Sequence, residues 1–171
     1  GVPVNMRNVE IVGGNYAIAN GGVAGRLYNV YAYGYNSGCV YSTGANWYTD
    51  CQFDANNPVT YGFYRAPYFT TGVAEDQISD TDFSGNFVNS FHVDDGTTHQ
   101  SLTKLVGCIF STPVAGVNHR WTVFIGCEIG NSAWTITATN PVTFVGCWNQ
   151  TGTMTLAGAN VILSGNYNIV A

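Results

Sequence analysis

Four carboxylates in the middle of the chain are the residues best suited to catalysis. They are Glu75, Asp76, Asp94 and Asp95. Glycoside hydrolysis needs two carboxyl groups about 5–9 Å apart, one of them with a raised pKa. These residues could supply such a pair, or they could be solvated residues at loop tips. A lyase would need a basic side chain supported by cations, and the chain has only five Lys and Arg residues in total.

A series of tyrosines points to a different activity, the binding of sugar rings. Tyr31, Tyr33 and Tyr35 alternate with other residues, so in a strand they would share one face. An exposed tyrosine presents a flat apolar face with a hydroxyl at its rim, which suits stacking on a sugar. Alternatively, these rings could form a contact between subunits or lie covered beneath a loop. Tyr28 and Tyr41 could extend this series. The candidate glycan-binding residues are Tyr28, Tyr31, Tyr33, Tyr35, Tyr64 and Tyr68.

The cysteines and histidines form no metal-binding or redox motif. Four of the five cysteines recur at one position of a repeat, which predicts a column of buried thiols. These four are Cys51, Cys108, Cys127 and Cys147. The three histidines lack the spacing of metal ligands. We therefore expect no metal and no cofactor.

All these residues are positioned by a short pattern that recurs about eight times. Each copy has an apolar residue two positions before a turn residue and a small or β-branched residue one position after it. The turn residues are Asn8, Asn29, Asp50, Asp80, Gly107, Gly126, Gly146 and Gly165. Most steps between them are 19 to 21 residues, and two are 30 and 27. A period near 20 in strand-forming residues predicts one coil of a solenoid per copy.

The apolar positions around each turn residue indicate the shape of a coil. Positions −2 and +1 relative to the turn residue are both apolar or small, although a flat strand would send them to opposite sides. They share a side only if the chain bends between them. Asn, Asp and Gly tolerate the left-handed conformation that makes such a bend. The pattern therefore predicts short parallel strands joined by tight corners.

This repeat resembles the right-handed parallel β-helix of pectate-lyase-like proteins. The resemblance is carried by Asn29-Val30, Asp50-Cys51 and the Gly-Cys pairs at 107–108, 126–127 and 146–147. It covers residues 6 to 168 and implies an all-β solenoid of about eight coils. The Gly-, Asn-, Thr- and Tyr-rich composition, with few charges, looks most like a bacteriophage tailspike or tail fibre. That resemblance implies a trimer on the virion that contacts bacterial surface polysaccharide.

The outward positions divide the predicted solenoid near residue 105. Residues 1–104 carry the irregular steps and a polar, tyrosine-bearing exterior, and residues 105–171 form a regular stem. An apolar strip on the stem should not face water, which favours self-association, most simply as a homotrimer. The strip consists of Val106, Ile109, Ile125, Val145 and Trp148.

Charge and hydropathy narrow the partners of the chain. A net charge of −5 argues against nucleic acid or an anionic membrane as the main partner. No stretch is apolar for the roughly 18 residues that a membrane helix requires. We expect an extracellular, virion-borne fragment of a longer tail protein that binds bacterial polysaccharide. A polysaccharide depolymerase, hydrolase or lyase, and a purely structural trimeric stem are the alternatives.

Overall fold

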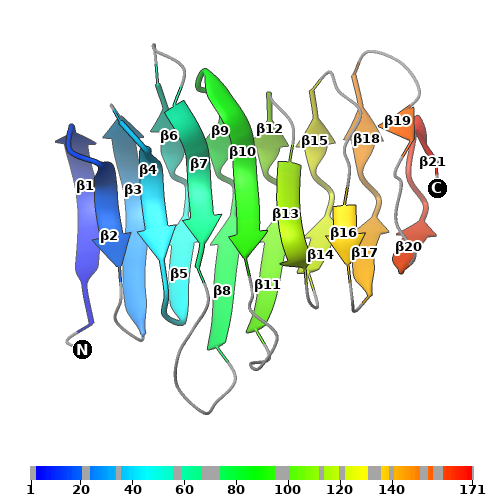
Figure 1. The fold of residues 1–171 in the computed structure, drawn as a ribbon, viewed down its shortest axis with the longest axis horizontal. Helices are drawn as coiled ribbons and strands as arrows, with labels where there is room; N and C mark the ends of the chain where they lie inside the picture. Colours follow the sequence, from blue (N-terminus) through cyan, green and yellow to red (C-terminus); the bar gives the residue numbers. More distant parts are fainter. Residues whose placement is uncertain are drawn as a thin grey trace.

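The computed structural model describes residues 3–20, 24–33, 36–55, 59–66, 74–94, 101–111, 114–119, 122–130, 136–138, 141–150, 154–155 and 160–170. These residues form β-strands and turns, and none of them lies in a helix. Every strand pairing is parallel, and the chain winds into stacked coils along one long axis (Figure 1). The predicted all-β parallel solenoid is confirmed.

The largest sheet contains 13 strands, which we call the long sheet. Its strands before the corners are β1 (Asn5–Val12), β3 (Gly25–Tyr33), β5 (Asn46–Thr49), β8 (Ala74–Ser79), β11 (Ser101–Val106), β14 (Thr122–Ile125), β17 (Val142–Val145) and β20 (Val161–Ser164). Its strands after the corners are β6 (Gln52–Asp54), β9 (Asp82–Phe83), β12 (Ile109–Phe110), β15 (Glu128–Ile129) and β18 (Trp148–Asn149). Strands β1 and β3 are long enough to run through the corner.

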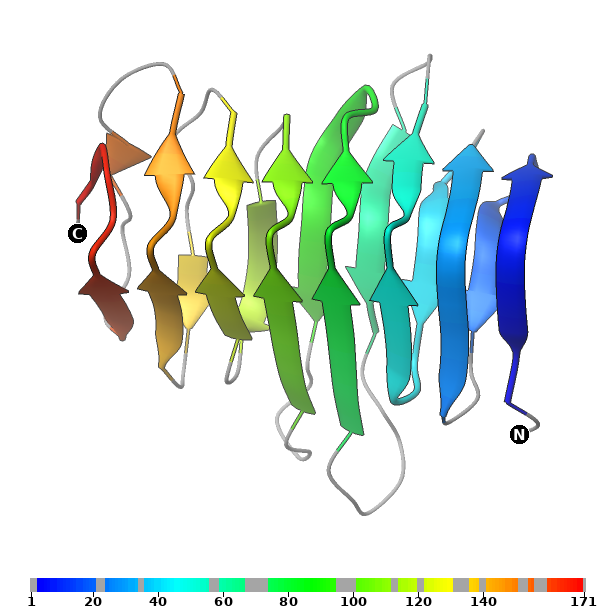
Figure 2. The ribbon, with the colours of Figure 1, turned by 180° about the vertical axis from the view of Figure 1, so that it is seen from behind.

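Two further sheets close the coils. The six-stranded sheet consists of β2 (Tyr16–Asn20), β4 (Gly38–Ser42), β7 (Val59–Arg65), β10 (Phe87–Asp94), β13 (Val114–His119) and β16 (Ile136–Ala138). Strands β19 (Met154–Thr155) and β21 (Ile169–Val170) pair separately. The six-stranded sheet lies in front of the long sheet in Figure 1 and behind it in Figure 2. The core fills the space between them.

All eight predicted turn residues form left-handed corners. Their φ angles lie between 49° and 62°. Such angles cost little for glycine and are tolerated by Asn and Asp, which explains why only these types occupy the position. Figure 2 shows the long sheet from its outer side, with a kink between the lower and upper strands in the coils that follow β3. The bend inferred from positions −2 and +1 is therefore confirmed.

The predicted inward columns form the core. In the column before the corners, the side chains from Leu27 to Phe144 are at most 1 % exposed. Aromatic rings of successive coils stack, most closely in Phe124 and Phe144, whose centroids are 4.5 Å apart at an interplanar angle of 2°. At the N-terminal end the packing is looser, because Val9 lies on the first strand and is 38 % exposed. The long sheet continues unbroken from one predicted region into the other through β11.

The number of complete coils is smaller than expected. The expectation of about eight coils counted every copy of the corner pattern. The structure supports about five turns, because the six-stranded sheet closes the coils only from β2 to β16. The last copies add strands to the long sheet, and their return strand β19 pairs with β21. No helix in the described ranges is long and apolar enough to cross a bilayer.

Candidate functional site

Four tyrosines form a half-buried cluster on the six-stranded sheet. We call this cluster, Tyr16, Tyr41, Tyr61 and Tyr64, the tyrosine surface. The ring centroids of Tyr16 and Tyr41 are 5.3 Å apart, and those of Tyr41 and Tyr64 are 5.5 Å apart. Tyr61 stacks on Tyr64 at 4.9 Å with an interplanar angle of 17°. The rings come from three adjacent strands, so together they make a continuous aromatic area.

Parallel register and one glycine bring these rings together. Tyr41 is paired with Tyr64 across β4 and β7, so their side chains leave the sheet side by side. Gly38 lies between Tyr16 and Tyr61 in the neighbouring row. A Cβ at Gly38 would lie 3.1 Å from Cε1 of Tyr16 and would clash with the carbonyl oxygen of Tyr61. The absence of a side chain at Gly38 therefore makes room for the Tyr16 ring.

The hydroxyl of Tyr16 in the tyrosine surface is held in its neutral form. Burial raises the pKa of Tyr16, and the neighbouring Tyr61 and Tyr41 raise it further. A neutral phenol both donates and accepts hydrogen bonds. The surface therefore offers flat apolar faces with polar rims, which is the chemistry that the sequence analysis assigned to Tyr64 and to tyrosines outside this surface.

The predicted glycan-binding tyrosines do not form one stripe. Tyr64 belongs to the tyrosine surface, but Tyr28 lies before the Asn29 corner, on the outside of the long sheet. Tyr31 and Tyr33 lie after that corner. The left-handed bend at Asn29 redirects the chain between Tyr28 and these two residues. Tyr35 and Tyr68 lie outside the described residues. The sequence placed Tyr41 with the stripe of Tyr31, and the structure places it beside Tyr64 instead. Sequence reasoning did not assign Tyr16 and Tyr61 to a binding surface, because their only signal was their placement on return strands of neighbouring coils.

Tyr31 borders an acidic groove that follows the corners. Its hydroxyl donates a hydrogen bond of 3.2 Å to Oδ2 of Asp54. Burial, followed by the charge of Asp54, raises the pKa of Tyr31. The groove has a volume of about 240 Å³ and is also lined by Asp50, Asp80 and Asp82. Burial raises the pKa of Asp82, and Asp54 raises it further.

Of the four predicted catalytic carboxylates, Glu75 and Asp76 have described side chains, and these two do not lie together at a surface. Glu75 and Asp76 lie on strand β8 rather than at a loop tip. Glu75 is half-buried and accepts a 2.8 Å hydrogen bond from Nε2 of Gln77, whereas Asp76 is completely buried. The side chain of Asp94 and the whole of Asp95 lie outside the described residues. Strand alternation separates Glu75 from Asp76, so this adjacent pair cannot act on one substrate.

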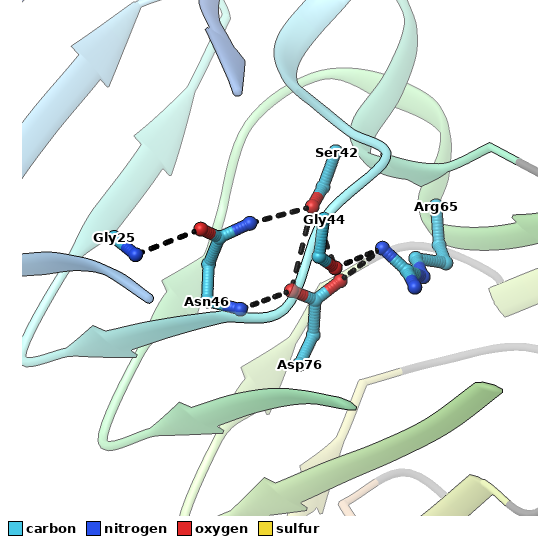
Figure 3. A network of polar contacts seen from close by, with 6 residues as sticks. All are labelled: Gly25, Ser42, Gly44, Asn46, Arg65 and Asp76. Carbon is cyan, nitrogen blue, oxygen red and sulfur yellow. Dashed lines mark hydrogen bonds and ion pairs between the residues drawn. The ribbon is translucent and has the colours of Figure 1, made fainter. Parts of the chain in front are cut away.

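Asp76 instead forms a buried ion pair with Arg65. Nη1 of Arg65 lies 3.1 Å from Oδ2 of Asp76, and both side chains are 0 % exposed (Figure 3). The same guanidinium donates a hydrogen bond to the carbonyl oxygen of Gly44. The hydroxyl of Ser42 donates to Oδ2 of Asp76 at 3.1 Å, and the backbone N–H of Asn46 donates to Oδ1 at 3.0 Å.

This network joins the end of one sheet to the start of the other. Ser42 and Arg65 end strands β4 and β7, whereas Asn46 and Asp76 belong to β5 and β8. Burial raises the pKa of Asp76 to about 6 despite the adjacent Arg65. The carboxylate is therefore mostly ionised at pH 7 and holds a structural contact.

The four cysteines after the corners form the predicted column of buried thiols. Each thiol donates a hydrogen bond to the carbonyl oxygen two residues earlier, at 3.4 Å in Cys51 and 3.5 Å in Cys127. Thr81 fills the vacant place in this column, and its hydroxyl makes the same contact with Ser79 at 2.9 Å. Hydrogen bonding to Cys108 and burial raise the pKa of Cys127 to about 12. These thiols pack the core, and the described residues contain no cluster suited to a metal.

The predicted apolar strip is partly exposed, since Val106 and Ile125 are half-buried, and it is divided into two parts. Val106, Ile125 and Val145 lie side by side on successive strands before the corners, and Val145 is 38 % exposed. Beyond the corners, Glu128 separates Ile109 from Trp148. Ile109 and Trp148 are 42 % and 39 % exposed.

Fold and surfaces together define this chain as a parallel β-solenoid. Comparison with known protein families, curated proteins and solved structures gives no match. Its function is therefore inferred from the geometry of its surfaces.

Proposed function

We propose that this chain binds bacterial surface polysaccharide, as part of a bacteriophage tailspike or tail fibre exposed on the virion. The observation that carries this proposal is the tyrosine surface. Its ring centroids are 4.9 to 5.5 Å apart across three strands. A polysaccharide laid across the strands would meet one ring after another, stacking on the faces and hydrogen bonding to the rims.

Binding is favoured over cleavage by the location of the carboxylates. The predicted residue Asp76 is enclosed and paired with Arg65, so it cannot reach a glycosidic bond. The acidic groove at Tyr31 lies along the corners of the long sheet, whereas the tyrosine surface lies on the six-stranded sheet. Among the side chains that the structure describes, a polymer bound on the tyrosine surface would therefore meet aromatic rings without a carboxyl pair beside them.

Calorimetric titration with purified capsular polysaccharides and lipopolysaccharides from a panel of bacterial hosts tests the proposal. For a polysaccharide that binds, we expect Tyr41→Ala and Tyr64→Ala each to weaken binding about 3- to 10-fold, because each removes a stacked ring. Tyr167→Ala is the control, since Tyr167 is 69 % exposed and lies near the other end of the solenoid. Equal affinity in all three variants would refute the assignment of the surface.

Analysis of the polysaccharides after incubation with the protein also tests for cleavage. New reducing ends or unsaturated products would favour the depolymerase alternative. Asp82→Asn would then be the first variant to examine, because Asp82 has a raised pKa within the acidic groove.

We further propose that the chain assembles as a homotrimer through the apolar strip. The support is the row Val106, Ile125 and Val145 on adjacent strands, with Trp148 39 % exposed beyond the corner. Light scattering should give a trimer for the unaltered chain and a monomer for Val145→Lys/Trp148→Ser. Val88→Lys is the control, because Val88 is 58 % exposed on the six-stranded sheet. A monomeric unaltered chain would refute this assembly.

A further inference from the structure

The outside of the long sheet carries two arginines beside two aromatic rings on its first strands. We call this group, Arg7, Arg26, Tyr28 and Trp47, the basic face. Arg7 is paired with Tyr28, and Arg26 with Trp47, across neighbouring strands. The guanidinium carbon of Arg7 lies 5.1 Å from the centroid of the Tyr28 ring. The corresponding distance from Arg26 to the Trp47 ring is 5.5 Å.

Stacking on a ring orients each guanidinium for binding. A guanidinium that lies over an aromatic face keeps its in-plane N–H groups directed outward. Arg7 and Arg26 are exposed, and Tyr28 is 43 % exposed. Together with Asn5, these three residues line an open depression of about 520 Å³. The donors of both arginines therefore border a space large enough for a sugar residue.

Neither arginine is neutralised by the described part of the chain. No carboxylate oxygen of a described residue lies within 4.0 Å of either guanidinium. Glu75 shares this face of the long sheet, but it lies two strands beyond Arg26 and accepts a hydrogen bond from Gln77. In a chain with a net charge of −5, two adjacent cations without a carboxylate form a distinct local environment.

The spacing of the two arginines suits a single anionic group. Arg26 is paired with Asn5, so it lies diagonally from Arg7 on the adjacent strand. Diagonal neighbours in a sheet are about 7–8 Å apart at their backbones. Two long arginine side chains can converge from that separation on one carboxylate or phosphate, each donating two N–H groups.

We infer that the basic face binds an anionic saccharide, with Arg7 and Arg26 holding its carboxylate or phosphate. The sugar ring attached to that group lies in the depression beside Tyr28. This site goes beyond the proposed function, because the tyrosine surface lies on the other sheet and has no cation among its four residues. The anionic group supplies the selectivity, since a neutral sugar leaves both guanidiniums without a partner.

Calorimetry with three oligosaccharide probes tests the site. The probes are an oligogalacturonate, a neutral oligosaccharide of the same length, and a phosphorylated sugar of the same ring type. We expect at least one anionic probe to bind about 10-fold more tightly than the neutral probe, and its affinity to fall as salt rises. A carboxylate ligand is indicated if only the oligogalacturonate binds, and a phosphate ligand if only the phosphorylated sugar binds. Equal binding of all three probes, or none, would overturn the inference.

Variants of matched charge separate a specific site from general attraction. Arg26→Gln should weaken anionic binding about 3- to 10-fold, and Arg26→Lys should restore it only in part, because lysine lacks the planar fork. Lys104→Gln removes the same charge from the same row of the sheet, three strands further on, and should change affinity less than 2-fold. Equal losses in Arg26→Gln and Lys104→Gln would refute the site.

The two binding surfaces can fail independently. Tyr41→Ala/Tyr64→Ala should leave binding of the anionic probe unchanged, because these rings lie on the six-stranded sheet. If that variant abolishes anionic binding while Arg26→Gln does not, the tyrosine surface binds the probe and the basic face is refuted. Circular dichroism of each variant shows whether the fold is retained.

Discussion

The coils before residue 105 and those after it follow the same backbone path with different side chains. At the corners, φ is 50° in Asn29 and 58° in Gly126. The earlier corners are all Asn or Asp, and the later ones are all Gly. Two of the earlier side chains bond between coils, through a 2.8 Å hydrogen bond that Nδ2 of Asn29 donates to Oδ1 of Asn8. The backbone therefore fixes the corner, and its side chain is free to differ between regions.

The same contrast appears on the outside of the long sheet. One row of paired residues runs Arg7, Tyr28, Thr49, Ser79, Val106, Ile125, Val145 and Ser164. It begins with a charged and an aromatic residue, and its stretch from Val106 to Val145 is aliphatic. One repeated backbone thus presents a charged and aromatic surface at one end of the sheet and an aliphatic surface towards the other.

The interior also differs between the two regions. Between β4 and β8 the core contains the buried pair Arg65 and Asp76, whereas further along it contains stacked rings such as Phe124 and Phe144. A buried charge is tolerated only while its partner is present, whereas stacked rings depend on shape and volume. The earlier coils should therefore be the more sensitive to loss of a single charge.

The largest expected effect is the loss of the buried cation. Arg65→Ala leaves the Asp76 carboxylate enclosed without a counter-ion, and should lower the free energy of unfolding by about 3–5 kcal/mol. Urea denaturation followed by circular dichroism measures this loss. Arg26→Ala is the control and should change the free energy by less than about 0.5 kcal/mol, because Arg26 is exposed. A loss below about 1 kcal/mol for Arg65→Ala would contradict a structural role for the pair.

The second effect is a pH dependence that arises from Asp76. Its pKa is about 6 in the folded chain, above the ordinary value of 3.8, so the folded state binds the proton more tightly than the unfolded state. The contribution of Asp76 to stability should therefore increase as the pH falls from 7 to 4, by about 2 kcal/mol. The measurement is the difference in unfolding free energy between the unaltered chain and Asp76→Asn at both pH values. A difference that does not change, or that changes in the opposite direction, would show that the folded pKa is not raised.

The corners of the two regions should differ in what they tolerate. Gly126→Ala places a Cβ in the left-handed region and should cost about 1–2 kcal/mol. Gly126→Asn should cost less, because Asn tolerates this conformation and no atom lies within 4 Å of the added Cβ. Thermal unfolding of both variants tests the order. If the Asn variant were the less stable, the two kinds of corner would not be interchangeable.

The smallest expected effect concerns Ala24, which has a left-handed backbone although it is not Asn, Asp or Gly. Its φ is 62°, and its backbone N–H donates a 2.6 Å hydrogen bond to the carbonyl oxygen of Ala45. Ala24→Gly removes the steric strain and should raise the free energy of unfolding by about 0.5–1 kcal/mol. A lower melting temperature in this variant would mean that the alanine side chain contributes packing that outweighs the strain.

The corners and the inward columns could be predicted because they repeat locally. Each corner residue and its neighbours at −2 and +1 lie within four consecutive positions, so their pattern survives changes in loop length. The thiol column followed for the same reason. The number of closed coils could not be predicted, because the corner pattern does not show whether a return strand such as β19 joins the six-stranded sheet.

The tyrosine surface and the buried ion pair could not be predicted in the same way. Tyr16, Tyr41 and Tyr64 lie on return strands, whose distance from the corners varies with the insertions. Arg65 and Asp76 meet only where the end of one sheet faces the start of the other. The sequence shows these residues as a loop cation and a loop-tip carboxylate, since neither burial nor register can be read from their immediate neighbours.

The corner segments at Gly126 and Gly146, which are in register, have a consequence for how such a protein can lengthen. Phe124 is paired with Phe144, and Glu128 with Trp148, so the two corner segments superimpose residue by residue along the axis. Because each coil contacts mainly its neighbours, duplication of one coil would lengthen the solenoid without disturbing the packing of distant coils. A solenoid of this kind can therefore evolve a longer reach by copying whole coils, while its binding surfaces stay unchanged.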